Sequence, residues 1–175
     1  MTCPFLPSSV VLPSHPDRPV NLNHYEFHSA WHIDAAPGDT FDGLNDIMRY
    51  PLWWPEIKEV VQLGEDRYMV VARSLLPYSL RFESRPGVVD RGAGILETIM
   101  TGDLEGYSRW RLSPEGTGTS VIFEERVDAN KKLLRRLALI GRPFFIANHS
   151  LMMHRARRGM AVYMAGRRSA RSGDR

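Results

Sequence analysis

The chain contains a single cysteine, Cys3, and no long apolar run. One cysteine cannot form a disulfide within the chain, and it cannot supply the thiolate ligands of a zinc cluster. No segment approaches the roughly 20 apolar residues that a membrane-spanning helix requires. The N-terminus has no basic start, and its prolines would interrupt the apolar core of a secretory signal. We therefore expect a cytoplasmic protein in a reducing compartment.

The short motifs that mark many catalytic sites are also missing. The sequence has no glycine-rich phosphate loop, no GxSxG and no defensible Ser–His–Asp set. Cys3 falls in a segment expected to be mobile, which is a poor place for an oriented nucleophile. His28 and His32 are too far apart on a strand to share a metal easily. We expect neither a metal nor another cofactor.

The charge balance argues against a nucleic-acid partner. Formal net charge is +3 and the pI is about 9.2. Much of the excess lies in Lys131–Arg136 and Arg167–Arg175, whereas a nucleic-acid-binding protein needs a dense basic face. A positive charge excess of this size favours solubility or weak attraction to an anionic surface.

Size and composition predict one domain flanked by an N-terminal leader and a C-terminal tail. A chain of 175 residues, 43% of them apolar and 25% charged, suits a single globular domain with an adequate core. Residues 1–22 are dense in proline and serine and predict a mobile leader. The domain is expected over 23–166, and a disordered basic tail over 167–175.

A long helix is predicted over Arg142–Gly166. Gly141 is expected to break the preceding element, and Pro143 suits a first helical turn. At about 100° per residue, one side of this helix is apolar, rich in methionine and aromatic residues, and contains Phe145, His149, Met152, Met153, Ala156, Met160 and Tyr163. This apolar arc predicts contact with the core, and its methionines suit a surface that accepts variable shapes.

The preceding chain predicts one strand and then two short helices. His24–Asp34 alternates in polarity, with Tyr25, Phe27, Trp31 and Ile33 expected to face inward. Ala35–Met48 has apolar residues at helical spacing. Arg49–Ile57 is a shorter, proline-interrupted turn of helix with two tryptophans. Since adjacent side chains cannot share a helix face, one tryptophan is expected in the core and the other at a pocket or in solvent.

Six further strands, joined by tight turns, are predicted between Glu59 and Ala129. They indicate an antiparallel meander over Val60–Leu63, Tyr68–Leu76, Tyr78–Asp90, Ile95–Thr101, Tyr107–Leu112 and Thr119–Val127. Pro86–Gly87 suggests a bulge or bend at an edge. Asp128–Ile140 is expected to be a short helix. A curved sheet must cover its concave face, and the long C-terminal helix is the element long enough to do so.

Several short motifs in this order carry a family resemblance. They are Trp53-Trp54-Pro55, the turn Gly102–Gly106 followed by Trp110 and Leu112, and Gly118-Thr119 at the start of the last strand. Over residues 24–166 the chain resembles the START/Bet v 1-like (SRPBCC) superfamily, and within it the polyketide cyclase/dehydrase and lipid-transport branch. The resemblance implies an α+β helix-grip fold, in which a seven-stranded antiparallel sheet surrounds a long C-terminal helix supported by two short helices. It also implies a small hydrophobic ligand between sheet and helix, and no universal catalytic residue.

Inward-facing residues supply the candidate site. His149 is the candidate acid or base, with a neutral histidine bonded to a backbone carbonyl or water as the alternative. Glu125 is expected to point inward, so it needs a partner, a raised pKa or solvent at the cavity mouth. Tyr107 is either a ligand contact or a sheet-edge residue, and the inward face of Ile95–Thr101 stays open. The candidate ligand-binding residues are Trp53, Trp54, Tyr78, Phe82, Trp110, Phe123, Glu125, Phe145, His149, Met152 and Met153.

Three functions are compatible with these observations. The favoured one is binding or transport of a small hydrophobic, lipid- or polyketide-like molecule in an internal cavity. The second is a polyketide cyclase, aromatase or dehydratase that uses His149 as acid or base. The third is an interaction module that uses the basic C-terminal end on a membrane surface or an acidic partner.

Overall fold

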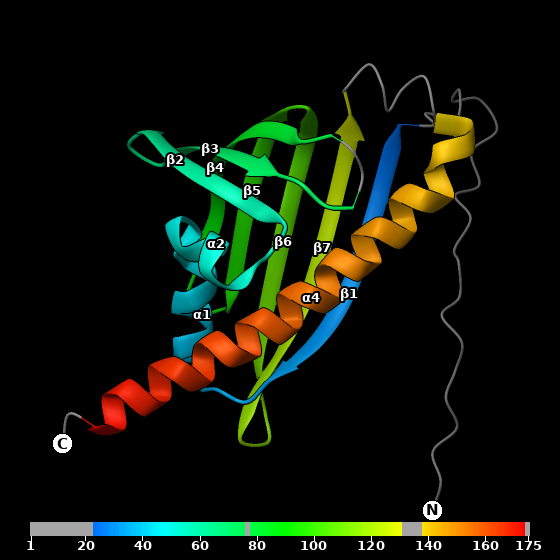
Figure 1. The fold of residues 1–175 in the computed structure, drawn as a ribbon. Coiled ribbons are helices and arrows are strands. Elements are labelled where there is room, and N and C mark those ends of the chain that lie inside the picture. The colour runs from blue at the N-terminus through cyan, green and yellow to red at the C-terminus, as the bar shows by residue number, and fades with distance from the viewer. Residues whose placement is uncertain (1–22, 76–77, 131–137, 174–175) are drawn as a thin grey trace, which may run out of the picture.

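A seven-stranded antiparallel sheet grips a long C-terminal helix (Figure 1). The computed structural model describes residues 23–75, 78–130 and 138–173, so the expected leader over 1–22 lies outside the described residues. The spatial order is β1-β7-β6-β5-β4-β3-β2, which pairs the first strand with the last. The strands are β1 His24–Ile33, β2 Ile57–Gly64, β3 Arg67–Ala72, β4 Leu80–Asp90, β5 Ile95–Gly102, β6 Leu104–Glu115 and β7 Gly118–Ala129. The predicted α+β helix-grip fold is confirmed.

Alternation along the strands divides the sheet into an inner and an outer face. On β1 the buried residues are those that the sequence pattern predicts, namely Tyr25, Phe27, Trp31 and Ile33. On β5, whose inward face the sequence left open, Leu96 and Met100 are buried and Ile95 and Ile99 are not. Residues 96, 98 and 100 therefore face the interior.

The predicted bulge at Pro86 is present, but in an inner strand. The pairing of β4 with β5 shifts register between Pro86 and Val89. Proline cannot donate a ladder hydrogen bond, so it needs a side without a neighbour. The pairing of β3 with β4 ends at Ser84, which leaves Pro86 at a local edge of the sheet.

Two short helices and a 3-10 turn follow β1. They are α1 (Pro37–Asn45), η1 (Ile47–Arg49) and α2 (Tyr50–Trp53). Pro37 occupies the first turn of α1, where its missing N–H costs no hydrogen bond. Both tryptophans at the end of α2 are buried, so the alternative that placed one of them in solvent is wrong.

The long helix, α4, runs from Ala138 to Gly173 and crosses the sheet diagonally, with α1 and α2 near its C-terminal half (Figure 1). The buried residues of that half are Ala156, Met160 and Met164, and Met153 is buried just before it. Gly159 lets the helix approach α2 very closely, because a Cβ there would lie 1.7 Å from the carbonyl oxygen of Trp53. The contact between α4 and α2 therefore depends on a missing side chain.

The bounds of α4 differ from the prediction at both ends. The helix continues through Gly141 and Pro143, where we expected a break and a start. A glycine inside a helix costs only about 1 kcal/mol relative to alanine, so the rest of the helix can outweigh it. The expected disordered tail is helical up to Gly173. Arg167 donates a hydrogen bond to the hydroxyl of Tyr163 one turn earlier, and Arg168 donates to the carbonyl oxygen of Asp34.

The short helix expected over Asp128–Ile140 is not found as such. Asp128 and Ala129 belong to β7, and Ala138–Ile140 already belong to α4. Asp128 pairs with His24 across the β1–β7 ladder, so sheet pairing overrides its tendency to cap a helix. The part of the expected helix between residues 131 and 137 lies outside the described residues.

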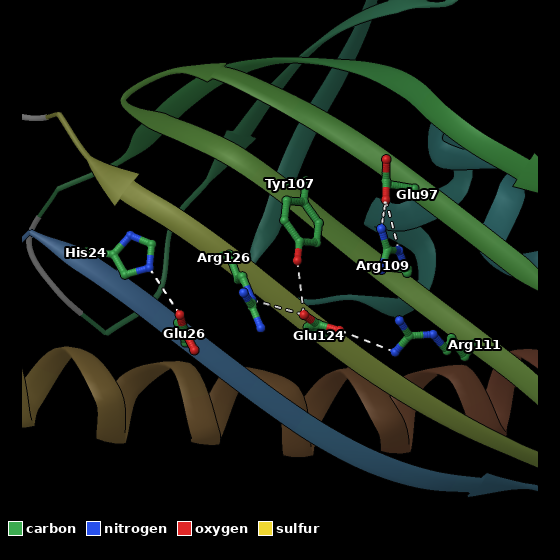
Figure 2. Close-up of polar contacts among 8 residues, drawn as sticks. All are labelled: His24, Glu26, Glu97, Tyr107, Arg109, Arg111, Glu124 and Arg126. Atoms are coloured by element: carbon green, nitrogen blue, oxygen red, sulfur yellow. Dashed lines mark hydrogen bonds and ion pairs between the residues drawn. The ribbon is translucent and has the colours of Figure 1, made fainter. Parts of the chain in front are cut away.

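The outer face of β5–β7 carries a charged cluster centred on Glu124 (Figure 2). Glu124 accepts a hydrogen bond from the Tyr107 hydroxyl at 3.0 Å and forms ion pairs with Arg126 at 3.0 Å and Arg111 at 3.3 Å. Burial opposes ionisation of Glu124, but these three donors outweigh it and hold the pKa of Glu124 below its ordinary value. Tyr107 thus faces away from α4, and a ligand contact by Tyr107 inside the fold is ruled out.

None of the helices in the described ranges combines the length and apolarity needed to cross a bilayer.

Replacing Gly159 with alanine is expected to destabilise the fold by about 1–3 kcal/mol, because the added methyl group would overlap the backbone of Trp53. Gly166→Ala is the matched control on the same helix, since a Cβ there meets no atom within 4 Å. The control should be neutral, or more stable by up to about 1 kcal/mol. Thermal unfolding of both variants measures the difference, and equal melting temperatures would contradict the close approach of α4 to α2.

Glu124→Gln is expected to lower the free energy of unfolding near neutral pH and to lower it much less in acid. A carboxylate with a lowered pKa in the folded state stabilises that state above its unfolded pKa, and this contribution is lost as the pH falls. Urea unfolding of wild type and Glu124→Gln at several pH values between about 7 and 3 should show that the difference in their free energies of unfolding shrinks as the pH falls. Glu65→Gln, at an exposed residue, is the control that should follow wild type. A difference in unfolding free energy that does not change with pH would show that Glu124 acts through packing instead of charge.

Candidate functional site

A cavity of about 130 Å³ lies between the inner face of the sheet and the N-terminal half of α4. Its wall is mostly apolar, with Phe27, Val70, Leu80 and Val127 among the residues that the sequence analysis had not proposed. The interior is thus hollow instead of filled by the aromatic and methionine side chains around it. A mainly apolar hollow with a few polar groups is the usual form of a small-molecule site.

Most of the residues proposed from the sequence do line this cavity. They are Trp54, Tyr78, Phe82, Trp110, Phe123, Glu125, Phe145, His149 and Met152. Trp53 and Met153 do not line it and belong to the packed core instead. The Trp53 ring packs against the rings of Tyr50 and Trp54 instead, and Met153 lies on the fully buried side of α4.

Glu125 of β7 and His149 of α4 form a polar pair in the cavity wall. The Oε2 atom of Glu125 lies 2.9 Å from Nε2 of His149, and the two side chains are 11% and 14% exposed. Sequence reasoning placed each of them inward but did not pair them. The two residues are far apart in the sequence, and no local pattern predicts their contact. It forms only because α4 crosses β7. Solvation of Glu125 at the cavity mouth is therefore not the arrangement found.

Aromatic rings hold the imidazole of His149 in place. The ring of Phe27 stacks on it with centroids 3.7 Å apart, and Phe123 stacks at 6.2 Å. Phe27 lies directly opposite Glu125 in the β1–β7 ladder, so one strand pair supplies both the stacking ring and the carboxylate. The arrangement orients His149, and with Nε2 facing Glu125, the Nδ1 atom is the nitrogen left for another partner.

A second polar group in the wall was missed by the sequence analysis. Ser74 donates a hydrogen bond to Oδ1 of Asn148 at 2.7 Å, and both residues line the cavity. Asn148 precedes His149 on α4, at the border of the apolar arc. The position of Asn148 next to His149 could have identified it as a wall residue. Its partner Ser74 follows β3, and no sequence pattern links the two residues.

Two tyrosines of the wall remain neutral hydrogen-bonding groups. Burial raises the pKa of Tyr50 and of Tyr78 above the ordinary value of a phenol. The Tyr50 hydroxyl donates to the carbonyl oxygen of Leu44 at 2.7 Å. Tyr50 therefore links α2 to the end of α1 and also contributes its ring to the wall.

Within the described residues, no group of three or more histidine, cysteine, aspartate or glutamate side chains is arranged to hold a metal ion.

Comparison with solved structures supports the fold. The aromatase/cyclase Zhui from a Streptomyces species is 12% identical, covers 82% of this chain and 95% of its own, and gives a TM-score of 0.66. A START superfamily protein from Mycobacterium smegmatis is 12% identical, with 81% and 97% covered and a TM-score of 0.65. A protein from Thermus thermophilus is 15% identical, with 79% and 99% covered and a TM-score of 0.64.

Comparison of the sequence with known proteins gives one result at the level of the family. No curated protein matches the chain. The family model described as polyketide cyclase / dehydrase and lipid transport matches residues 33–142, from the end of β1 to the first turns of α4. This span contains both short helices and β2–β7, and it is more than half of the chain. The chain therefore belongs to the polyketide cyclase/dehydrase and lipid transport family.

Proposed function

We propose that the protein binds a small, largely apolar molecule in the cavity between the sheet and α4. The observation that carries this proposal is the hollow itself, enclosed by apolar side chains from α2, α4 and most of the strands. Removing apolar surface of a ligand from water would contribute about 25 cal/mol per Å². The polar pair Glu125–His149 would fix the orientation of the ligand.

The half-buried state of the N-terminal part of α4 supports the same proposal. Phe145, His149 and Met152 face the cavity and keep some exposure, whereas Met153 and Met160 further along are fully buried. Methionine and phenylalanine side chains at such a wall can adjust to ligands of different shape. A carrier of lipid- or polyketide-like molecules needs that property, and a rigid core does not.

A specific observation also favours the second candidate, a cyclase- or dehydratase-type enzyme. A histidine held by a buried carboxylate 2.9 Å away is a common arrangement for general acid–base catalysis. One structurally similar protein is an aromatase/cyclase by its own description. In such an enzyme His149 would transfer the proton, and Glu125 would orient the ring.

The third hypothesis, a basic docking surface at the C-terminal end, stays a prediction with less support. Arg167 and Arg168 already contact Tyr163 and Asp34 of the same chain.

Filling the cavity should abolish binding. Leu80→Trp adds an indole to the wall and is expected to weaken binding of the fluorescent probe 1-anilinonaphthalene-8-sulfonate at least tenfold, since little space would remain. Leu63→Trp is the matched control, because Leu63 is exposed on β2. Fluorescence titration gives the affinities, and circular dichroism verifies folding. A folded Leu80→Trp protein that binds the probe like wild type would refute the cavity as the site.

His149→Ala separates the carrier from the enzyme. A carrier should keep its affinity for the same probe within about fivefold, because one hydrogen bond contributes little net free energy. An enzyme should lose turnover of a linear poly-β-carbonyl substrate by a factor of about 100 or more, because acid–base catalysis commonly contributes that much. Product formation is followed by mass spectrometry. If the wild-type protein converts no such substrate, the enzyme candidate loses its support.

Loss of His149 is also expected to lower stability, by about 1–3 kcal/mol, because Glu125 would remain buried without its partner. The double variant Glu125→Gln with His149→Ala removes the charge as well and should recover part of that loss. Chemical unfolding of wild type, both single variants and the double variant tests this, and additive losses in the double variant would show that the two side chains are not coupled.

A further inference from the structure

Three polar side chains cross the inner face of the sheet in one row. Glu125 of β7 lies directly opposite Ser108 of β6, and Ser108 lies directly opposite Thr98 of β5. All three line the cavity. Directly opposed residues on neighbouring strands have Cβ atoms about 5 Å apart, so the row spans about 10 Å of the cavity floor.

The row is bordered by apolar residues on the same strands. The inward-facing positions next to it are occupied by Phe123 and Val127 on β7, Trp110 on β6, and Leu96 and Met100 on β5. A sheet that only packed against a helix would favour apolar side chains at this level as well. Instead, β5, β6 and β7 each have a polar residue at this inward position, and these positions line the cavity.

The two hydroxyl groups of the row have free hydrogen-bonding capacity. Glu125 is paired with His149, but neither the Ser108 nor the Thr98 hydroxyl makes a hydrogen bond within the described part of the chain. Hydroxyl groups in apolar surroundings destabilise a protein unless a partner is present. A ligand with oxygen atoms at matching positions would supply that partner.

We propose that Glu125, Ser108 and Thr98 form a binding row for an elongated, mainly apolar ligand that carries several carbonyl or hydroxyl oxygens along its length. This inference rests on the proposed binding function of the cavity. His149 marks one end of the row. At the other end, Thr98 also borders a second hollow of about 120 Å³, whose wall includes the polar residues Ser84 and Arg85. The ligand would therefore lie across the strands, with its far end toward this second hollow.

The row sets specificity through hydrogen bonds and not through shape. A Ser or Thr hydroxyl donates to a ligand carbonyl or accepts from a ligand hydroxyl. A ligand without oxygens would leave both hydroxyls unsatisfied in the closed complex. Discrimination between an oxygenated ligand and its bare skeleton should therefore be lost when the hydroxyls are removed.

The test uses two probes with one ring skeleton, flavone and its trihydroxy derivative apigenin, and isothermal titration calorimetry on the full chain. Wild type is expected to bind apigenin at least tenfold more tightly than flavone, at about fivefold per hydrogen bond. The double variant T98V S108A should reduce that advantage to about twofold, and it should weaken flavone, which has a single carbonyl acceptor, by at most about fivefold. The control T101V S113A changes exposed hydroxyl residues on the same two strands and should behave like wild type.

The outcomes separate the row from the function on which it rests. If T98V S108A keeps the full preference for apigenin, or weakens both probes equally, the row is wrong and the cavity remains a binding site. If folded wild type binds neither probe, the proposed function fails and the row fails with it. Thermal unfolding of both double variants shows whether either result reflects a loss of folding.

Discussion

The packing of α4 against the sheet is the contact on which the rest of the structure depends. Its C-terminal half buries Ala156, Met160 and Met164, with Met153 buried just before it, and fully burying each methionine contributes about 1.5–3 kcal/mol. Gly159 allows the same half to touch the backbone of α2. The helix is thus held firmly at one end, and its other half can lie over an open space without losing its place.

This division of α4 explains how one helix serves both stability and binding. Packed interiors tolerate few voids, because each void gives up contact energy. A protein that keeps a hollow must gain its stability from other contacts. Here these are the buried half of α4 and the ring contacts that Trp110 of the cavity wall makes with Trp31 and Phe123. The cavity can then vary in its polar groups without endangering the fold.

The polar groups inside the fold and those outside it follow different rules. On the outer face, Glu124 has three partners around it and is held ionised by them. In the cavity, Glu125 has one partner among the described residues, His149, which comes from another element. Alternation along β7 places these neighbouring carboxylates on opposite faces. One charge strengthens the sheet, and the other is placed where a ligand would meet it.

Local patterns were sufficient for the strands of the sheet and for the short helices after β1. Alternation identified β1 and its inward residues, and the turns between the later strands set an antiparallel meander. The pattern failed where two tendencies compete: Asp128 suits a helix cap but joins β7, because strand pairing with β1 satisfies its backbone. It failed again at Gly141 and Gly166, because a long helix absorbs the cost of single glycines.

The sequence by itself determined which residues are apolar, in what period, and therefore the α+β class and the inward faces of most strands. It also placed His149 and Glu125 inside, since each lies on an apolar face. Only the tertiary structure decided that these two side chains meet, that Ser108 and Thr98 continue the row from Glu125, and that Trp53 is core while Trp54 is wall. Such contacts join residues far apart in the chain, so they depend on strand register and on the path of α4, and no local pattern encodes either of them.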